Sequence, residues 1–98
     1  MAYSLIVSSR AQKEIENASE YYALYSNNAP IKFIVALNNT YETLKSNPFF
    51  VVNYKNVRTL KLKKFPYSLY FVVNEKQRTV KVLSCFHNKR NPYKRPLI

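Results

Sequence analysis

The chain has 98 residues, of which 47% are hydrophobic and 15% aromatic, and its formal net charge at pH 7 is +11. This length predicts a single domain over residues 1–98, and the apolar fraction excludes an intrinsically disordered chain. The sequence has no glycine and one cysteine. We therefore expect asparagine at turns that need a positive φ, and an internal disulfide is excluded.

The single cysteine, Cys85, lies in an apolar stretch and is expected to be a buried thiol, which is typical of a reducing compartment. The N-terminal apolar run of Leu5, Ile6 and Val7 is too short for the core of a signal peptide. No stretch approaches the length of a membrane span. These features favour a cytoplasmic protein that does not enter a membrane.

The positive charge is unevenly distributed along the chain. Residues 1–52 carry four basic and four acidic side chains, whereas residues 53–98 carry twelve basic side chains and only Glu75 as an acid. A charge field serving solubility alone would not leave one half neutral. The asymmetry indicates that the second half binds an anionic partner, either a nucleic acid or an acidic protein.

The first half predicts a strand and two helices. Residues 3–7 form a short apolar run with β-branched members, which favours a strand. Ser9 and Gln12 have the spacing of a capping box, so a helix is expected to begin there, with its three glutamates in solvent. An apolar stripe with helical spacing then extends to about Tyr25: Ala11, Ile15, Ala18, Tyr22 and Tyr25.

A second helix is expected from Pro30, which suits the first turn, to the Asn47-Pro48 stop signal. Its apolar stripe consists of Phe33, Leu37, Tyr41 and Leu44, broadened by Ile34. The two helices are expected to form an antiparallel hairpin. Residues 49–56 are expected to connect this hairpin to the basic half.

Three antiparallel strands with alternating apolar residues are predicted in the second half, with connections at residues 65–67 and 74–78. The alternating apolar residues are Leu60 and Leu62, then Leu69, Phe71 and Val73, then Val80 and Val82. The predicted fold class is thus α+β, a β-α-α-β-β-β two-layer sandwich with the helical hairpin on the apolar face of the sheet.

The alternation also predicts which face carries the charge. If the leucines and valines face the core, Lys61 and Lys63 share the opposite face with Lys81 and His87. Arg58 has the parity of the leucines, so it either lies beyond the buried region or follows a bulge.

This order of elements, together with the segments VSSRAQKEIENASEYYA, YKNVRTLKLKKFPYSLYFVV and VKVLSCFHNKRNP, resembles the RelE/ParE superfamily of toxins from bacterial type II toxin–antitoxin systems. The resemblance covers essentially the whole chain. It implies a small basic toxin that causes growth arrest or plasmid stabilisation. It also implies a cognate antitoxin, whose tail, typically acidic, wraps the sheet in a hetero-oligomer.

The superfamily offers two targets and therefore two functions. RelE-like members resemble ribonucleases that cut messenger RNA on the ribosome without a metal or other cofactor. Such chemistry needs an acid or base and cations that stabilise phosphorane charge. By resemblance these roles fall to His87, Arg58, Lys61 and Lys63, and histidine is the side chain that ionises near neutral pH.

ParE-like members act on DNA gyrase and lack that nuclease site. This reading is slightly favoured, because nuclease members usually carry an arginine where this chain has Tyr67 and Ser68. A basic RNA-binding module without toxicity is a third reading, based on charge alone. The residues expected to contact a nucleic acid or another target are Lys61, Lys63, Lys64, Lys81, Lys89, Arg90 and Tyr93.

Overall fold

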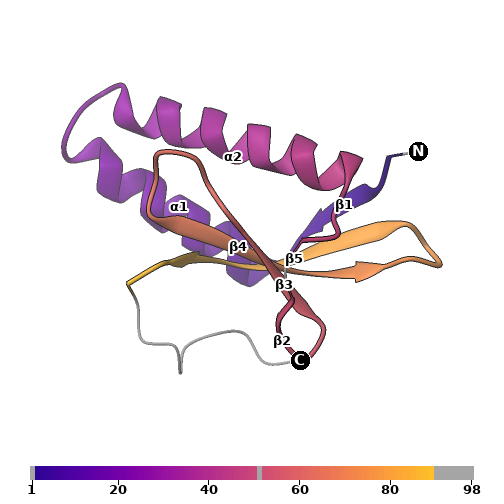
Figure 1. Ribbon diagram of the computed structural model, residues 1–98. Helices are drawn as coiled ribbons and strands as arrows, with labels where there is room; N and C mark the ends of the chain where they lie inside the picture. Colours follow the sequence, from indigo (N-terminus) through magenta and orange to yellow (C-terminus); the bar gives the residue numbers. More distant parts are fainter. Residues whose placement is uncertain (1, 51, 90–98) are drawn as a thin grey trace.

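The computed structural model describes residues 2–50 and 52–89 of the chain. It contains two helices and five strands (Figure 1). In chain order these are β1 (Ser4–Val7), α1 (Ser9–Ala23), α2 (Ala29–Ser46), β2 (Val52–Tyr54), β3 (Val57–Lys61), β4 (Tyr67–Asn74) and β5 (Thr79–His87).

The strands form one mixed sheet in the order β1-β5-β4-β3-β2. β1 pairs with β5 in parallel, and the other neighbours are antiparallel. The predicted α+β class and the antiparallel meander are confirmed. The edge strand β2 was missed, because three residues are too few to show an alternating pattern within the expected connection. The first predicted connection, residues 65–67, was also misplaced at both ends, since β3 ends at Lys61 and Tyr67 opens β4.

Both helices pack on one face of the sheet, as the apolar stripes predict. The buried cluster joins Ala11 and Ala18 of α1 and Phe33 of α2 to Leu69 and Phe71 of β4. Tyr22 lies 5.5 Å from Phe33 between ring centroids, which links the two helices to each other. Tyr25, expected in the stripe, is instead 69% exposed because α1 ends at Ala23.

The start of α1 also differs from the prediction. The N-cap is Ser8, whose hydroxyl accepts a hydrogen bond from the Ala11 amide at 3.1 Å. The Gln12 side chain donates to the Val7 carbonyl at 3.0 Å and so does not complete a capping box with Ser9. Either serine has a suitable side chain, and the sequence spacing selected the wrong one.

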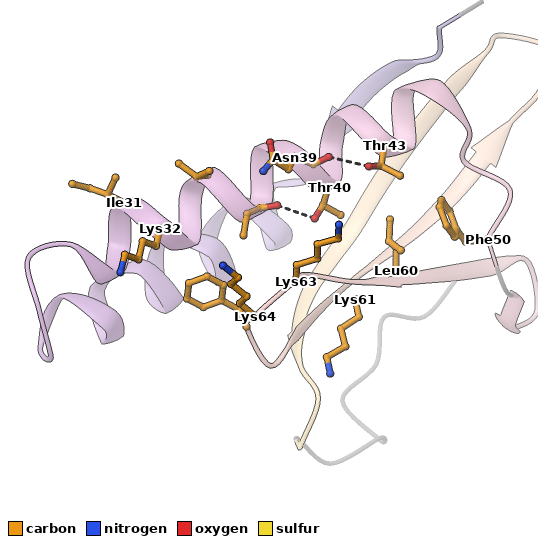
Figure 2. Close-up of a pocket in the computed structure, with 13 residues that line it drawn as sticks. Ile31, Lys32, Asn39, Thr40, Thr43, Phe50, Leu60, Lys61, Lys63 and Lys64 are labelled. Carbon is orange, nitrogen blue, oxygen red and sulfur yellow. Dashed lines mark hydrogen bonds between the residues drawn. The ribbon is translucent and has the colours of Figure 1, made fainter.

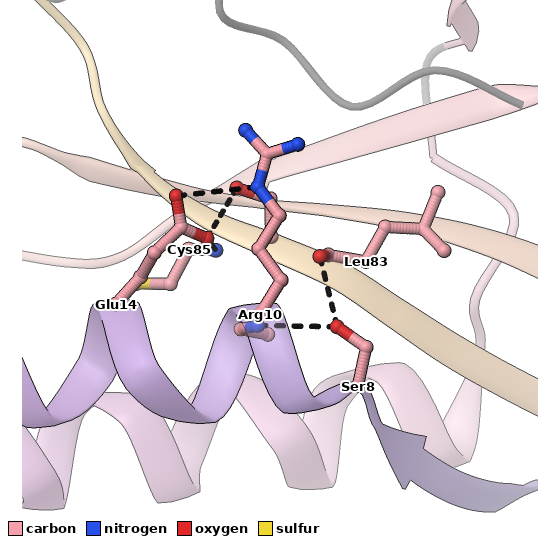
Figure 3. Close-up of polar contacts among 7 residues, drawn as sticks. Ser8, Arg10, Glu14, Leu83 and Cys85 are labelled. Carbon is pink, nitrogen blue, oxygen red and sulfur yellow. Dashed lines mark hydrogen bonds and ion pairs between the residues drawn. The ribbon is translucent and has the colours of Figure 1, made fainter.

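The N-terminal half of α1 closes the edge of β5 where β1 has ended (Figure 3). The Ser8 hydroxyl donates to the Leu83 carbonyl at 2.9 Å. A carboxylate oxygen of Glu14 accepts hydrogen bonds from the Ser84 hydroxyl at 2.6 Å and from the Cys85 amide at 3.2 Å. Glu14 was expected in solvent. Instead it accepts hydrogen bonds from groups of β5 beyond Val82, where β1 no longer pairs with this strand.

A β-bulge in β5 changes which side chains share a face. Tyr70 pairs with Ser84 and Phe71 pairs with Val82, so Leu83 is an extra residue on β5. The bulge shifts the side-chain alternation by one residue. His87 therefore pairs with Tyr67, which belongs to the core cluster, and lies on the helix-covered face. Lys81 precedes the bulge and lies on the opposite face, so the prediction that they share a face was wrong.

The expectation that asparagine would hold the positive φ values was wrong as well. Among the described residues the positive φ values belong to Lys55 (50°), Lys64 (69°) and Arg78 (51°). All three are basic residues at or beside tight turns. Among the described residues, the left-handed backbone positions are thus occupied by lysine and arginine.

Candidate functional site

The sheet has one face without a helix, which we call the open face, and Lys61 lies on it. Lys61 pairs with Ser68 of β4, and Ser68 pairs in turn with Phe86 of β5. Residues paired in register share a face, so these side chains lie on the side opposite the core residue Leu69. Lys61 is exposed at the end of β3. It is therefore free to meet a partner that approaches the open face.

Arg58 is on the other face and is held by the segment after α2. It pairs with the core residue Phe71, and its guanidinium donates to the Phe50 carbonyl at 2.7 Å. The same guanidinium lies 5.3 Å from the centroid of the Phe49 ring, within the range of a cation–π contact. Arg58 was predicted either to lie beyond the buried region or to follow a bulge. It lies at the border of the buried region, where it is partly exposed.

Lys63 and Lys64 follow β3 and face a groove beside α2 (Figure 2). The Lys63 side chain extends toward Thr40 of α2, whereas Lys61 points away from that helix. The expected sharing of one face by Lys61 and Lys63 is therefore wrong, because β3 ends at Lys61 and the chain turns.

The groove lies between α2 and the β3–β4 turn and has a volume of about 810 Å³. Its apolar lining includes Val35, Leu60 and Phe65, and Lys32, Lys61, Lys63 and Lys64 add positive charge at its border. Sequence reasoning did not find this groove. The available signal was Ile31 and Val35, two apolar residues outside the core stripe of α2 that are 62% and 54% exposed.

His87 ends β5 against the ring of Tyr67. The two ring centroids are 5.0 Å apart, with the planes nearly perpendicular. The Lys89 amide donates to Nδ1 of His87 at 3.1 Å. Because Nδ1 accepts this bond, a neutral imidazole carries its proton on Nε2, and Nε2 has no lone pair with which to act as a base.

The remaining predicted contact residues are spread over the molecule. Lys81 is exposed on the open face, but it pairs with Val72, four residues along β4 from Ser68, or about 13 Å. Lys89 is exposed just beyond β5, at the same end of the sheet as Lys61. Arg90 and Tyr93 lie outside the described residues.

The predicted set of catalytic residues is thus divided by the sheet. Lys61 lies on the open face, Arg58 and His87 lie on the helix-covered side, and Lys63 faces the groove. Within residues 2–50 and 52–89, no three His, Cys, Asp or Glu side chains gather as metal ligands would. No helix in the described part of the chain is long and apolar enough to cross a membrane.

Several solved structures from toxin–antitoxin systems have a similar fold. The chain is 22% identical to a chain of the chromosomal ParDE system from P. aeruginosa, with a TM-score of 0.64 over 88% of this chain and 96% of that one. It is 12% identical to a chain of the RelBE2 complex from Mycobacterium tuberculosis, with a TM-score of 0.62 over 89% and 99%.

A mutant of the E. coli toxin RelE in the free state is also similar, with 19% identity and a TM-score of 0.61 over 91% of this chain and 86% of that one. At these identities the structures show a shared fold. The shared fold is the helical hairpin on one face of a mixed sheet.

The family model for the ParE toxin of the type II toxin–antitoxin system parDE matches residues 5–92. The chain belongs to this family and is a toxin of a type II toxin–antitoxin system. This confirms the resemblance seen in the sequence. No curated protein matches the sequence closely enough to be counted as a relative.

Proposed function

We propose that this toxin acts in the ParE manner, on DNA gyrase, and that a cognate antitoxin neutralises it. The observation that supports gyrase over messenger RNA is the separation of the four candidate catalytic residues. A metal-independent nuclease needs its acid, base and phosphate-binding cations around one phosphodiester. Here His87 and Lys61 lie on opposite faces of the sheet, since the bulge at Leu83 reverses the alternation.

The contacts of two of these residues support the same choice. Arg58 is engaged by the Phe50 carbonyl and the Phe49 ring. His87 accepts a hydrogen bond from the Lys89 backbone amide at Nδ1. This bond occupies the lone pair with which the neutral imidazole would have to accept a proton as a general base. Both side chains have structural partners where a nuclease would need reactive groups.

The groove beside α2 suits an antitoxin segment. Its apolar lining can bury one face of an amphipathic peptide, and the lysines at its border attract carboxylates on the other face. We propose that the antitoxin places an acidic amphipathic segment there. The neighbouring ParDE and RelBE structures come from such toxin–antitoxin systems.

The groove proposal is tested by expressing toxin variants with and without the antitoxin. A Val35→Glu substitution adds a negative charge to the groove lining and should repel an acidic segment, so the variant should arrest growth even when the antitoxin is present. Asn38→Glu, on the same helix but outside the groove lining, is the matched control and should be neutralised like the wild type. Equal neutralisation of both variants would place the antitoxin elsewhere.

A RelE-like ribosome-dependent endonuclease is the second candidate, supported by the RelE structures that share the fold and by the exposed Lys61. This candidate requires new 5′ ends in messenger RNA after toxin expression, and it requires that His87→Ala abolish them. Cuts that persist in His87→Ala would remove the histidine from the mechanism. A non-toxic RNA-binding module would produce no growth arrest at all.

A further inference from the structure

Four exposed hydrophobic side chains lie at the closed end of the helical hairpin, and we call this set the hairpin tip. Tyr21, Leu24 and Tyr25 come from the end of α1 and the residues just after it, and Ile31 comes from the start of α2. Each residue is between 50% and 82% exposed. Figure 1 shows the α1–α2 connection projecting at one end of the molecule, so the tip is open to a partner.

The two tyrosines of the tip are held in place before any partner binds. Their ring centroids are 5.2 Å apart, and their hydroxyls are hydrogen-bonded at 3.1 Å. Tyr21 also packs against the edge of Tyr22, and Tyr22 contacts the buried Phe33. A chain of aromatic rings thus joins the tip to the core. Side chains that are already ordered lose little conformational entropy when they bind a partner.

The tip lacks charge, although the protein as a whole is strongly basic. Residues 21–31 contain no acidic or basic side chain, whereas residues 53–98 carry twelve basic side chains and one acid. Two copies of the chain repel each other wherever their basic halves meet. A contact at the uncharged tip brings fewer like charges together.

Opposite charges flank the tip and suit a contact between two identical surfaces. Glu20 precedes Leu24 by one turn of α1, and Lys32 follows Ile31 on α2; both are exposed. Within residues 2–50 and 52–89 neither of these charged side chains has an ion-pair partner. In a two-fold contact each surface meets its own copy, so the glutamate of one copy can face the lysine of the other.

The size of the tip suits a weak dimer. Judged from their exposed fractions, the four side chains expose roughly 500 Å² per copy, so a two-fold contact would bury about 1,000 Å² in total. This area is at the lower limit of specific interfaces. Monomeric proteins seldom expose a contiguous apolar patch of that size.

We propose that a second copy of this chain docks on the hairpin tip, so that the free toxin forms a weak two-fold homodimer. The contact leaves the open face of the sheet uncovered. Ile31 also lines the groove beside α2, whereas the other three tip residues lie outside that lining. The proposal goes beyond the proposed function, because it depends neither on the target nor on the antitoxin.

Sedimentation velocity of the purified chain over a range of concentrations tests the proposal. We expect a monomer–dimer equilibrium with a Kd on the order of 10 μM. The dimer should become tighter as salt rises from about 0.1 M to about 1 M, because salt screens the repulsion between two chains of net charge +11. A monomer at every concentration, or a dimer that salt dissociates, would overturn the proposal.

A charge placed in the tip should break the contact. Leu24→Lys should weaken the dimer at least ten-fold, and a lysine at the C-terminal end of α1 favours the helix dipole, so the fold should be kept. Ile6→Lys is the matched control, because it makes the same charge change on β1 at a side chain that is also largely exposed. It should dimerise like the wild type. Equal weakening in the two variants would reduce the effect to net charge and overturn the proposal.

Tyr25 separates the contribution of the ring from that of charge. Tyr25→Ser removes the ring without adding a charge and should weaken the dimer about five-fold. Tyr25→Phe keeps the ring and should dimerise nearly as well as the wild type. Thermal unfolding of each variant shows that the fold is retained. An unchanged Kd in folded Tyr25→Ser would contradict the proposed contact.

Growth assays distinguish a second copy from other occupants of the tip. Leu24→Lys should arrest growth and be neutralised by the antitoxin like the wild type. Escape from neutralisation would assign the tip to the antitoxin, and loss of toxicity would assign it to the target; either result would overturn the proposal. Cleavage by gyrase tests the proposed function separately, and either result of that assay leaves the dimer standing.

Discussion

At the scale of single residues, three cations hold backbone conformations that usually belong to glycine. Lys55, Lys64 and Arg78 have φ values of 50°, 69° and 51°. A side chain with a Cβ atom pays about 1–2 kcal/mol in the left-handed region. The sequence could not reveal these positions, because they depend on how each turn joins its strands and lysine has no preference for them.

We expect Lys55→Gly to stabilise the fold by about 0.5–1 kcal/mol, since relief of the left-handed strain exceeds the added freedom of the unfolded chain. Lys76→Gly is the control, an exposed lysine in the other hairpin whose φ is not positive. It should be neutral or destabilising. Urea unfolding of both variants measures the difference, and equal midpoint shifts would contradict the strain argument.

Tyr41 gives the fold a pH dependence at alkaline pH. Burial raises the pKa of its phenol from 10.0 to about 12, so the folded state favours the protonated form. Stability from this group is complete below pH 10 and is lost as the pH rises toward 12. Because the side chain is only partly buried, we expect a loss of about 1 kcal/mol.

Chemical unfolding at neutral pH and near pH 11 tests this effect of Tyr41. The Tyr41→Phe variant removes the phenol but keeps the ring, so it should lose less stability than the wild type over the same interval. All other ionisable groups are the same in both proteins, so the comparison isolates the phenol of Tyr41. Identical pH profiles would show that Tyr41 does not ionise during alkaline unfolding.

At the scale of elements, Glu14 joins α1 to β5. Glu14→Ala leaves the Ser84 hydroxyl and the Cys85 amide without their acceptor, and Ser84 is fully buried. We expect destabilisation of about 1–3 kcal/mol. Glu16→Ala, an exposed position on the same helix, should change stability by less than about 0.5 kcal/mol. A small effect at Glu14, measured by thermal unfolding, would show that water replaces the carboxylate.

Hydrophobic periodicity predicted both helices and four of the five strands because each buries one face in a common core. It could not predict the bulge at Leu83, because a bulge depends on how β5 pairs with β4 and not on which residues β5 contains. The misassigned face of His87 follows from that single residue. Glu14 was missed for a related reason, because its buried partners come from the far end of the chain.

At the scale of the whole molecule, charge is segregated between the two halves of the chain. The neutral first half supplies both helices and β1, and the basic second half supplies most of the sheet, three of the lysines beside the groove and the lysines of the open face. The sequence predicted the basic surface but not its division into two parts. That division follows from the end of β3 at Lys61, after which Lys63 turns toward α2. Lys63 therefore lies at the groove alone, whereas Lys61 borders both the groove and the open face.

Action on gyrase is tested most directly by supplying the toxin to purified gyrase with DNA, and in parallel to a translation extract in which messenger RNA 5′ ends are mapped. We expect trapped double-strand breaks that depend on gyrase, together with intact messages. Ribosome-dependent cuts in messenger RNA, with gyrase unaffected, would contradict this expectation and make the chain a RelE-like nuclease.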